Sequence, residues 1–494
     1  MNKSQRSPLP PRRSGWALTA LTAVGAIATA AVLVLAGCAS PGETRPQSER
    51  ITSAAVGLDG GTRAPALTDR WWQSFHDEAL DAMVQRALDG HPSLKAAHAR
   101  VQRAEALVTS AGAAALPQVQ GTFDATRQRY TENGLAPPPL AGATLSSGTL
   151  QASLSWELDF FGRHRADLEA AIGAQRAAEA DAQAARVLLA ANVARNYVQL
   201  ARLVEQREVA RRSFGQRDEV LALIRQRVQS GLDTNVELRQ GEGALPETRQ
   251  QIEAFDEQIA LTHHALAALT VQPPNAFDTL EPRLQAVQAV PLPPSVPADL
   301  LGRRADVEAA RWRVEAASKD MVAARAQFYP SVNLIAFAGF SAIGLDRLLD
   351  IGSRQYGVGP ALRLPIFDAD RLRAQYKGKA ADVDAAVESY NSAVIDAVRD
   401  VADQIASLQS LERQQREQAA AAQAAESAYD LARQRFKAGL GSYLTVLTAE
   451  SNVLTQRRGA TDLKARAIDT QIALMRALGG GYSGADAAAR GSAL

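Results

Sequence analysis

Six histidines and one cysteine are the side chains of this 494-residue chain best suited to metal binding or nucleophilic catalysis. None of the histidines lies at metal-ligand spacing from the cysteine or from a carboxylate: His76, His91, His98, His164, His263 and His264. The adjacent His263 and His264 would point to different sides of a helix and could not share a metal. The chain also lacks a glycine-rich phosphate loop after a strand and a G-x-S-x-G motif. We therefore expect no catalytic residues, no metal site and no cofactor.

The only cysteine, Cys38, lies at the end of a segment typical of an export signal. Residues 1–15 hold four basic residues and no acidic one, and residues 16–37 are uncharged and mostly apolar. The ending Leu35-Ala36-Gly37-Cys38 resembles the lipobox of bacterial lipoproteins, which implies cleavage before Cys38 and lipidation of the new N-terminus. By the same resemblance, alanine rather than aspartate after Cys38 implies sorting to the outer membrane. Two alternatives stay open: a transmembrane anchor formed by the apolar run, and a buried thiol.

Residues 149–160 alternate polar and apolar side chains in the order TLQASLSWELDF. Because successive side chains of a β-strand point to opposite faces, this pattern predicts a strand with one apolar and one polar face. No run of 18 apolar residues follows the signal, so a membrane crossing would require closed β-structure. We therefore expect the apolar face of this strand to contact lipid, through Leu150, Ala152, Leu154, Trp156 and Leu158. Aromatic residues in and near the strands suit a lipid interface or, equally well, a packed core: Trp156, Phe160, Phe161 and Tyr356.

The strand leads into about 70 residues without proline that carry apolar residues at helical spacing, enough for a helix of ~100 Å. The chain then repeats itself. A heptad seam before Pro117 recurs before Pro330, and each position is shifted by 213 residues: Leu94, Ala97, Val101, Ala104, Val108, Ala111 and Ala115 correspond to Val307, Ala310, Val314, Ala317, Met321, Ala324 and Phe328. Gly231-Leu232 likewise recurs 208 residues later as Gly439-Leu440. The shared register indicates an internal duplication.

The pattern predicts six segments along the chain. They are a signal peptide at 1–37, a lipidated N-terminal tether at 38–70, a first repeat at 71–272, a Pro-rich linker near the equatorial region at 273–300, a second repeat at 301–478 and a flexible C-terminal tail at 479–494. The first repeat would contain strands at about 118–130 and 147–160 and helices at about 77–115, 162–230 and 236–271. The second would contain strands at about 331–341 and 355–366 and helices at about 303–328, 370–438 and 443–478.

The two repeats supply four strands, which are too few to enclose a passage and would leave two edges unpaired in lipid. Three chains together would supply twelve strands, an even number within the range of outer-membrane barrels. The predicted fold class is therefore mainly α with β, built from a duplicated unit of helix, strand, strand, long helix and helix. As a trimer it would form a 12-stranded outer-membrane β-barrel, from which the helices would extend away from the membrane as long coiled-coil hairpins.

Several motifs in this framework resemble the TolC-like outer-membrane factors, and more closely their OprM/NodT lipoprotein branch. The matching motifs are Leu35–Cys38, Trp71-Trp72, the seams that end at Pro117 and Pro330, Arg435–Leu440, Tyr443–Leu447 and Ala477–Tyr482. The resemblance covers nearly the whole mature chain. It implies a lipid-anchored homotrimer in contact with outer-membrane lipid of a Gram-negative bacterium, in which the 12-stranded β-barrel stands on a long α-helical coiled-coil tunnel in the periplasm. Such a trimer acts as the exit duct of a tripartite efflux system for drugs or other small molecules. It also implies two protein partners, a periplasmic adaptor and an inner-membrane pump of the resistance-nodulation-division type.

Other classes of protein account for less of the sequence. A periplasmic coiled-coil adaptor or scaffold lipoprotein would explain the heptads but neither the alternating strands nor the duplication. A cell-wall or lipid enzyme would need a catalytic set that the sequence lacks. Removal of the four basic residues of the signal leaves 50 basic against 53 acidic residues, a balance that gives no reason to expect nucleic-acid binding.

The resemblance also assigns candidate site residues at the two hairpin turns. Family members present Gly-Leu turns to the adaptor, which implies docking through Gly231, Leu232, Gly439 and Leu440. Helix capping alone would explain the glycines but not the leucines. The tunnel of the family narrows near these turns, often with carboxylates around it, and the gate candidates here are Glu237, Arg239, Thr445 and Thr448. Relatives often carry aspartate at the position of Thr448, and an exposed helix tip is the alternative for Glu237 and Arg239.

Overall fold

The computed structural model describes residues 40, 42–58, 67–135, 137–285, 287 and 300–482. The predicted signal peptide, Cys38, part of the predicted linker and most of the predicted tail therefore lie outside the described residues. The chain divides into two compact units. The first unit contains Leu107–Ala171, Glu315–Asp384 and the residues described before Ser48, and the second contains Ser48–Ala106, Ile172–Val314 and the described residues from Ala385 onward.

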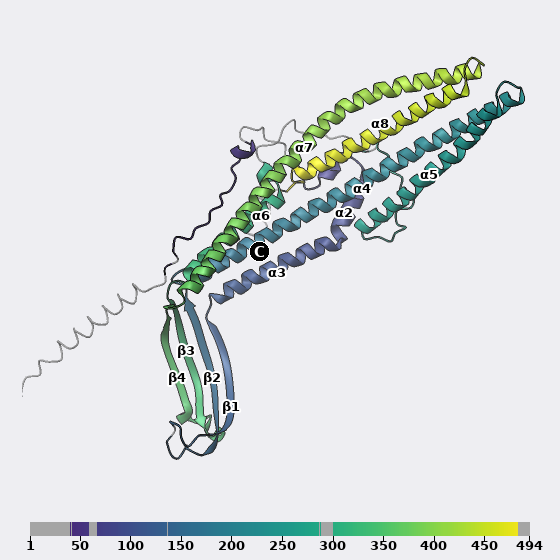
Figure 1. Ribbon diagram of the computed structural model, residues 1–494. Helices are drawn as coiled ribbons and strands as arrows, with labels where there is room; N and C mark the ends of the chain where they lie inside the picture. The colour runs from purple at the N-terminus through teal and green to yellow at the C-terminus, as the bar shows by residue number, and fades with distance from the viewer. Residues whose placement is uncertain are drawn as a thin grey trace, which may run out of the picture. The chain divides into compact units, whose positions relative to one another are not determined.

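The first unit is built on a four-stranded antiparallel sheet with the order β1-β2-β3-β4 (Figure 1). The strands are β1 (Gln118–Arg129), β2 (Thr144–Leu158), β3 (Ser331–Ile343) and β4 (Arg354–Arg363). Each half of the duplicated sequence contributes one hairpin, and the hairpins pair through β2 and β3. β2 begins at Thr144, three residues before the predicted start, because its pairing with β1 continues although residues 146–148 do not alternate.

The register of the strands places apolar side chains of all four on one face. Val119, Leu154, Ala336 and Val358 are partners in a single row across the sheet. Paired residues of antiparallel strands point to the same face, and the face repeats every second residue. The neighbouring row is also uncharged: Gly121, Ala152, Ala338 and Tyr356. The sheet therefore has an apolar face and an opposite face that is mostly polar.

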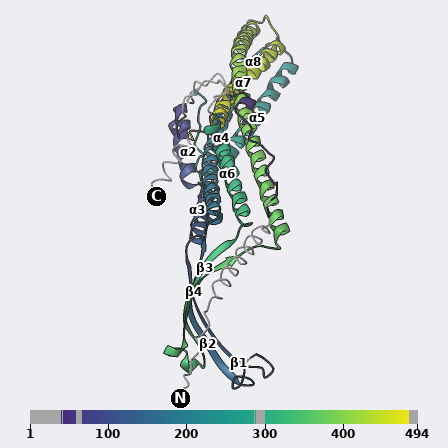
Figure 2. The same ribbon diagram turned by 90° about the vertical axis from the view of Figure 1, so that its left-hand side faces the viewer.

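The helices next to the sheet all attach at the same end of it, which we call the proximal end. They are α3 (Pro92–Ala114) before β1, α4 (Arg163–Gln229) after β2, α6 (Ala305–Ala326) before β3 and α7 (Ala369–Lys437) after β4. Here the Trp156 indole donates to the carbonyl oxygen of Ala115 at 3.0 Å, and Phe161 stacks on Tyr329 with 4.8 Å between ring centroids. The turns of both β-hairpins lie at the other, distal end, as a second view shows (Figure 2).

The second unit contains two helical hairpins, α4–α5 and α7–α8 (Figure 1). Their shorter helices are α5 (Asn235–Leu269) and α8 (Tyr443–Ala477), and a further helix, α2 (Glu78–Gly90), belongs to the same unit. The largest core of this unit forms around Trp71, Trp72 and Phe75, which pack with Leu200 and Leu203 of α4. Among the residues that the structure describes, no helix combines the length and the apolarity needed to cross a membrane.

The helix predicted at about 77–115 is interrupted at His91, between α2 and α3. His91 has an extended backbone, as expected for the residue before a proline. Pro92 begins α3, where a residue without an N–H loses no helical hydrogen bond. The His91 ring nitrogen Nδ1 lies 2.7 Å from the Ser93 hydroxyl and accepts a hydrogen bond from the Ser93 amide. His91 therefore shapes the start of α3.

Candidate functional site

Much of the apolar face of the sheet is exposed among the residues that the structure describes. The most exposed side chains lie on the two outer strands, with exposures of 64% to 83%: Val119, Phe123, Tyr356, Val358 and Leu362. The predicted lipid-facing set on β2, from Leu150 to Leu158, lies on the same face by register. Apolar surfaces of this extent are rare on soluble monomers and mark contact with lipid or with another protein.

The opposite face carries polar side chains that bind one another across the strands. The hydroxyls of Thr149 and Ser341 lie 3.2 Å apart. Asn333 Nδ2 donates to the Ser155 hydroxyl at 2.8 Å, and Gln355 Nε2 donates to Gln151 Oε1 at 3.0 Å. A sheet with one apolar and one hydrogen-bonding face is suited to separate an apolar phase from water.

The outer strands β1 and β4 are the edges of the sheet, and in the part of the chain that the structure describes each pairs with only one strand. One row of backbone N–H and C=O groups on each edge is therefore available for pairing with another strand. β1 is exposed along all 12 of its residues. Such an edge beside an apolar face cannot face lipid unpaired, because each unsatisfied backbone group would cost several kcal/mol there.

The two predicted docking turns share one geometry. Gly231 and Gly439 have φ angles of 68° and 77°, in the left-handed region that favours glycine. In each turn the amide of the next leucine donates to the carbonyl oxygen five residues earlier, at 2.8 Å. This bond ends the helix in a Schellman motif and satisfies its last carbonyl groups. The leucine side chains take no part in it, and Leu232 and Leu440 are 66% and 70% exposed.

Each hairpin tip carries a second exposed apolar side chain that the sequence analysis missed. These residues are Val236 and Leu444, in the first turns of α5 and α8, with exposures of 62% and 63%. They are 208 residues apart, the same offset that relates Leu232 to Leu440. The internal repeat therefore contained the signal for them. Each tip presents an apolar pair four residues apart.

Arg227 of α4 connects the first turn to the second hairpin. Its guanidinium makes two hydrogen bonds to the Asp233 carboxylate, at 2.8 and 3.0 Å, and this pairing raises the pKa of Arg227. The same guanidinium donates to the carbonyl oxygen of Phe436 at 3.4 Å and lies 4.7 Å from the centroid of its ring. The structure thus links the two turns through one nearly buried side chain.

Glu237, the acidic gate candidate, is engaged at the start of its own helix. Its carboxylate accepts a hydrogen bond from the Thr234 amide at 2.9 Å and another from the Thr234 hydroxyl. The Thr234 hydroxyl in turn accepts a hydrogen bond from the Val236 amide, which completes a capping box. These bonds to Thr234 hold the pKa of Glu237 below the ordinary value of a glutamate.

The other gate candidates also bind within their own helices. Arg239 pairs with Glu242 at 2.8 Å on the surface of α5. The Thr445 hydroxyl lies 3.0 Å from that of Ser442, and the Thr448 hydroxyl donates to a backbone carbonyl one turn earlier at 2.9 Å. Both threonines are exposed. A single chain therefore places all four candidates near the hairpin tips without bringing them into contact with one another.

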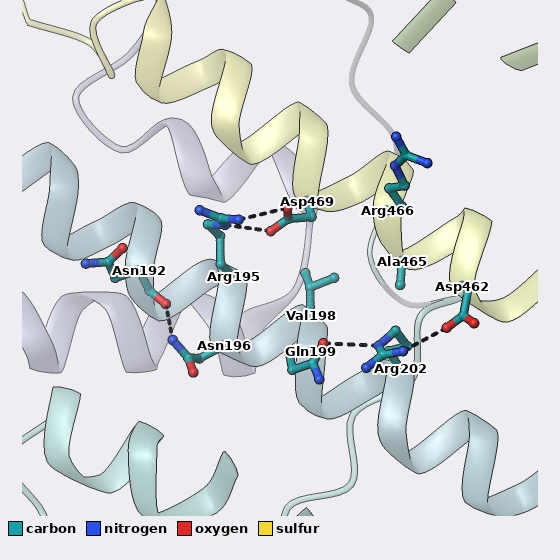
Figure 3. A pocket seen from close by; sticks show the side chains of 10 residues that line it. All are labelled: Asn192, Arg195, Asn196, Val198, Gln199, Arg202, Asp462, Ala465, Arg466 and Asp469. Atoms are coloured by element: carbon teal, nitrogen blue, oxygen red, sulfur yellow. Dashed lines mark hydrogen bonds and ion pairs between the residues drawn. The ribbon is translucent and has the colours of Figure 1, made fainter. Parts of the chain in front are cut away.

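A polar groove lies between α4 and α8, and oppositely charged side chains bridge it (Figure 3). Arg195 binds both oxygens of Asp469 at 2.7 and 3.1 Å, and Arg202 pairs with Asp462 at 2.8 Å. In each helix the two residues are seven apart, so the pairs recur at the heptad interval of antiparallel helices. These pairs join the first repeat to the second. Within the described ranges, no group of three histidine, cysteine or acidic residues could hold a metal.

Comparison with known proteins gives close relatives along the chain. The family described as outer membrane efflux protein matches residues 83–271 and 296–480. The chain is 38% identical over 362 residues to the fusaric acid resistance protein FusA of Burkholderia cepacia, covering 71% of this chain and 68% of FusA. It is 33% identical over 462 residues to the putative multidrug resistance outer membrane protein MdtQ of Escherichia coli, covering 91% of this chain and 96% of MdtQ.

The solved structures that this chain resembles are also outer-membrane proteins. The outer membrane protein VceC from Vibrio cholerae is 34% identical and has a TM-score of 0.79 over 83% of this chain and 98% of VceC. The outer-membrane channel OprN is 26% identical, with a TM-score of 0.80 over 89% of this chain and 98% of OprN. The predicted fold class and the predicted function as an outer-membrane efflux channel are confirmed. The chain belongs to the outer membrane efflux protein family.

Proposed function

We propose that three copies of this chain form the exit duct of a tripartite efflux system in the outer membrane of a Gram-negative bacterium. Twelve strands, four from each copy, close into one barrel in the membrane, and the long helices form a tunnel in the periplasm. Drugs or other small molecules pass through passively after an inner-membrane pump of the resistance-nodulation-division type delivers them through a periplasmic adaptor. The observation that carries the proposal is an apolar sheet face flanked by two unpaired edges.

Pairing between the sheets of neighbouring copies accounts for both the unpaired edges and the exposed apolar face. When β1 of one copy pairs with β4 of the next, no edge remains unpaired in lipid. The apolar set from Leu150 to Leu158 extends about 26 Å along β2, which gives a height of about 20 Å for a strand tilted by about 40°. This height covers most of the apolar band of about 25 Å on outer-membrane barrels. The polar face then lines the lumen, where its hydroxyl and amide groups contact water.

Lipidation of Cys38 is the second part of the proposal. Two residues later, the carbonyl oxygen of Ser40 accepts a hydrogen bond from Nε of Arg373 at 3.0 Å. The Gln47 amide donates to the Asp384 carboxylate at 2.7 Å. Arg373 is the fifth residue of α7 and follows the proximal end of β4 closely in sequence. These contacts support a tether held near the sheet, from which acyl chains on Cys38 reach the adjacent leaflet.

The hairpin tips are the proposed docking site for the adaptor. An exposed apolar pair stands at each tip, Leu232 with Val236 and Leu440 with Leu444. Isolated apolar knobs on the end of a helical hairpin are suited to insert between the helices of another hairpin. The partner surface is therefore expected to be helical and apolar at its centre.

Purification in detergent followed by conductance measurements tests the proposal. We expect a trimer that needs detergent to stay in solution and that forms ion-conducting pores in planar bilayers. Deletion of the gene should increase sensitivity to exported compounds, and complementation should require the partner pump and adaptor. A monomer that stays soluble without detergent and forms no pores would favour the coiled-coil adaptor instead.

A further inference from the structure

Both edge strands change from apolar side chains to arginine at the distal end of the apolar face. On β1 the face contains Val119, Gly121, Phe123 and Ala125, and continues to Arg127 and Arg129. On β4 it contains Leu362, Pro360, Val358 and Tyr356, and ends at Arg354. Each arginine is an even number of residues from its apolar neighbours, so it points to the same face. Arg354 is also the register partner of Phe340, a residue of that face.

All three arginines are exposed, and two of them form no ion pair within the part of the chain that the structure describes. Arg129 forms a surface ion pair with Glu132 at 3.0 Å, in which both side chains are about two-thirds exposed. Arg127 and Arg354 are exposed and have no side-chain hydrogen bond or ion pair to any residue that the structure describes. Two guanidinium groups with their hydrogen-bonding capacity free thus stand at the border of an apolar surface.

The proximal end of the same face has a different composition. The last residues of the face there are uncharged on all four strands: Val119, Leu158, Val332 and Leu362. Beyond them lie aromatic side chains, including the stacked Phe161 and Tyr329. The one arginine of β4 near this end, Arg363, lies on the opposite, polar face. The apolar band is therefore bordered by aromatic residues at one end and by arginines at the other.

We propose that Arg127 and Arg354 bind phosphate groups of lipid headgroups in the leaflet at the distal end of the sheet. A guanidinium offers a planar pair of donors that matches a phosphate in geometry and charge, and it is less strongly hydrated than an ammonium group. The position fits this ligand, because headgroups border the hydrocarbon layer that the apolar band would cover. Arg354 is level with Leu150 at the distal limit of that band, and Arg127 lies two rows further out on the same face. Arginines on the lumen face would not reach such a group.

Assembly brings the two arginines together, and this step rests on the proposed function. In the trimer, β1 of one copy lies beside β4 of the next, since these are the edges that must pair. Each of the three junctions then gathers Arg127 and Arg129 from one copy and Arg354 from its neighbour on the lipid-facing surface.

Counting of bound lipid by native mass spectrometry tests the site. Wild-type protein in neutral detergent is mixed with lipid A, a phosphorylated glycolipid, and compared with the double variant Arg127→Gln/Arg354→Gln. We expect about five-fold weaker retention of lipid A for each arginine lost. The control Arg363→Gln removes an arginine from the polar face of the same strand and should retain lipid A as the wild type does. Arg127→Lys/Arg354→Lys, which keeps the charge, should retain more lipid A than the glutamine variant.

The particle mass separates a failure of this site from a failure of the trimer. Arginine-dependent lipid A binding to a particle of monomer mass would support the phosphate site while contradicting the proposed assembly. Equal retention of lipid A by the wild type and the double glutamine variant, on particles of any mass, would overturn the site. Displacement of lipid A from the wild type by inorganic phosphate would assign the arginines to free phosphate and overturn the lipid proposal as well.

Discussion

Arg217 of α4 and Glu450 of α8 form a nearly buried ion pair, with 2.9 Å between Nε and Oε1 and side-chain exposures of 13% and 7%. Further hydrogen bonds surround the pair. Arg217 also donates to the Ala244 carbonyl oxygen at 3.2 Å and to the Thr248 hydroxyl at 2.9 Å, and the Ser213 hydroxyl donates to Glu450 at 3.1 Å. The network joins α4 and α5 of the first repeat to α8 of the second, below the hairpin tips.

Removal of Glu450 should strongly destabilise this region. Glu450→Ala leaves the enclosed Arg217 charge without its only buried carboxylate partner among the described residues, which should lower the free energy of unfolding by about 3 to 5 kcal/mol. Glu247 offers a matched control, because it lies 3.7 Å from the same arginine but is 64% exposed. Glu247→Ala should cost less than about 1 kcal/mol, since water screens exposed pairs. Guanidinium denaturation followed by circular dichroism measures both, and equal losses would contradict the assignment of Glu450 to the stabilising pair.

A charge on the apolar face of the sheet should impair membrane assembly. Leu154→Arg places a guanidinium near the middle of the proposed lipid-facing band, at a cost of about 2 to 4 kcal/mol. Ser155→Arg changes the next residue, which points to the polar face and is exposed. The amount of trimer in isolated outer membranes should fall for Leu154→Arg and stay near the wild-type level for Ser155→Arg. Equal amounts for the two variants would mean that β2 does not lie in a bilayer.

The exposed leucines at the hairpin tips should be needed for docking and dispensable for folding. Leu232→Asp with Leu440→Asp should abolish co-purification with the adaptor while leaving the trimer intact, because both side chains are largely exposed. The quadruple variant that also carries Val236→Asp and Leu444→Asp should likewise fail to co-purify with the adaptor. Leu232→Met with Leu440→Met keeps the apolar character and should keep adaptor binding. Loss of the trimer in the aspartate variant would instead make these leucines structural.

The capping carboxylate of Glu237 should make the hairpin tip sensitive to acid. Because its pKa is lowered from the ordinary 4.5, the contribution of the cap is fully present above that pH and is lost as the pH falls through the lowered pKa. If three copies line the narrow end of the tunnel, cation selectivity should weaken over the same acid range. Glu237→Gln should lose both the selectivity and its pH dependence in planar-bilayer recordings. Identical selectivity and pH response in wild type and variant would remove Glu237 from the gate.

Lipidation should add to the anchoring of the channel without being essential for it. Cys38→Ser removes the thiol that would carry the acyl chains, while the proposed barrel keeps a much larger contact with lipid than one anchor provides. We expect no incorporation of radioactive palmitate in this variant and reduced but measurable efflux. A wild-type protein that takes up no label would refute the lipidation itself.

The sequence by itself determined the features that depend on a few neighbouring residues. The alternation from Leu150 to Leu158 defines a two-faced strand because side-chain direction has a period of two along any strand. Gly231 and Gly439 end their helices because a Schellman turn needs one residue with positive φ. The 213- and 208-residue offsets showed the duplication, since a repeat is visible without knowledge of its packing.

The tertiary structure decided which distant residues meet. Arg217 and Glu450 are 233 residues apart in the chain, and no periodicity selects this pair among the many arginines and acids on the long helices. Arg127 and Arg354 share a face only because the register of the pairing extends that face across four strands. The contacts of the gate candidate Glu237 are instead local, because its carboxylate forms a capping box with Thr234, three residues earlier in the chain. Local geometry depends on residues that are neighbours in the sequence, whereas ion pairs, shared faces and exposure depend on how the two repeats pack.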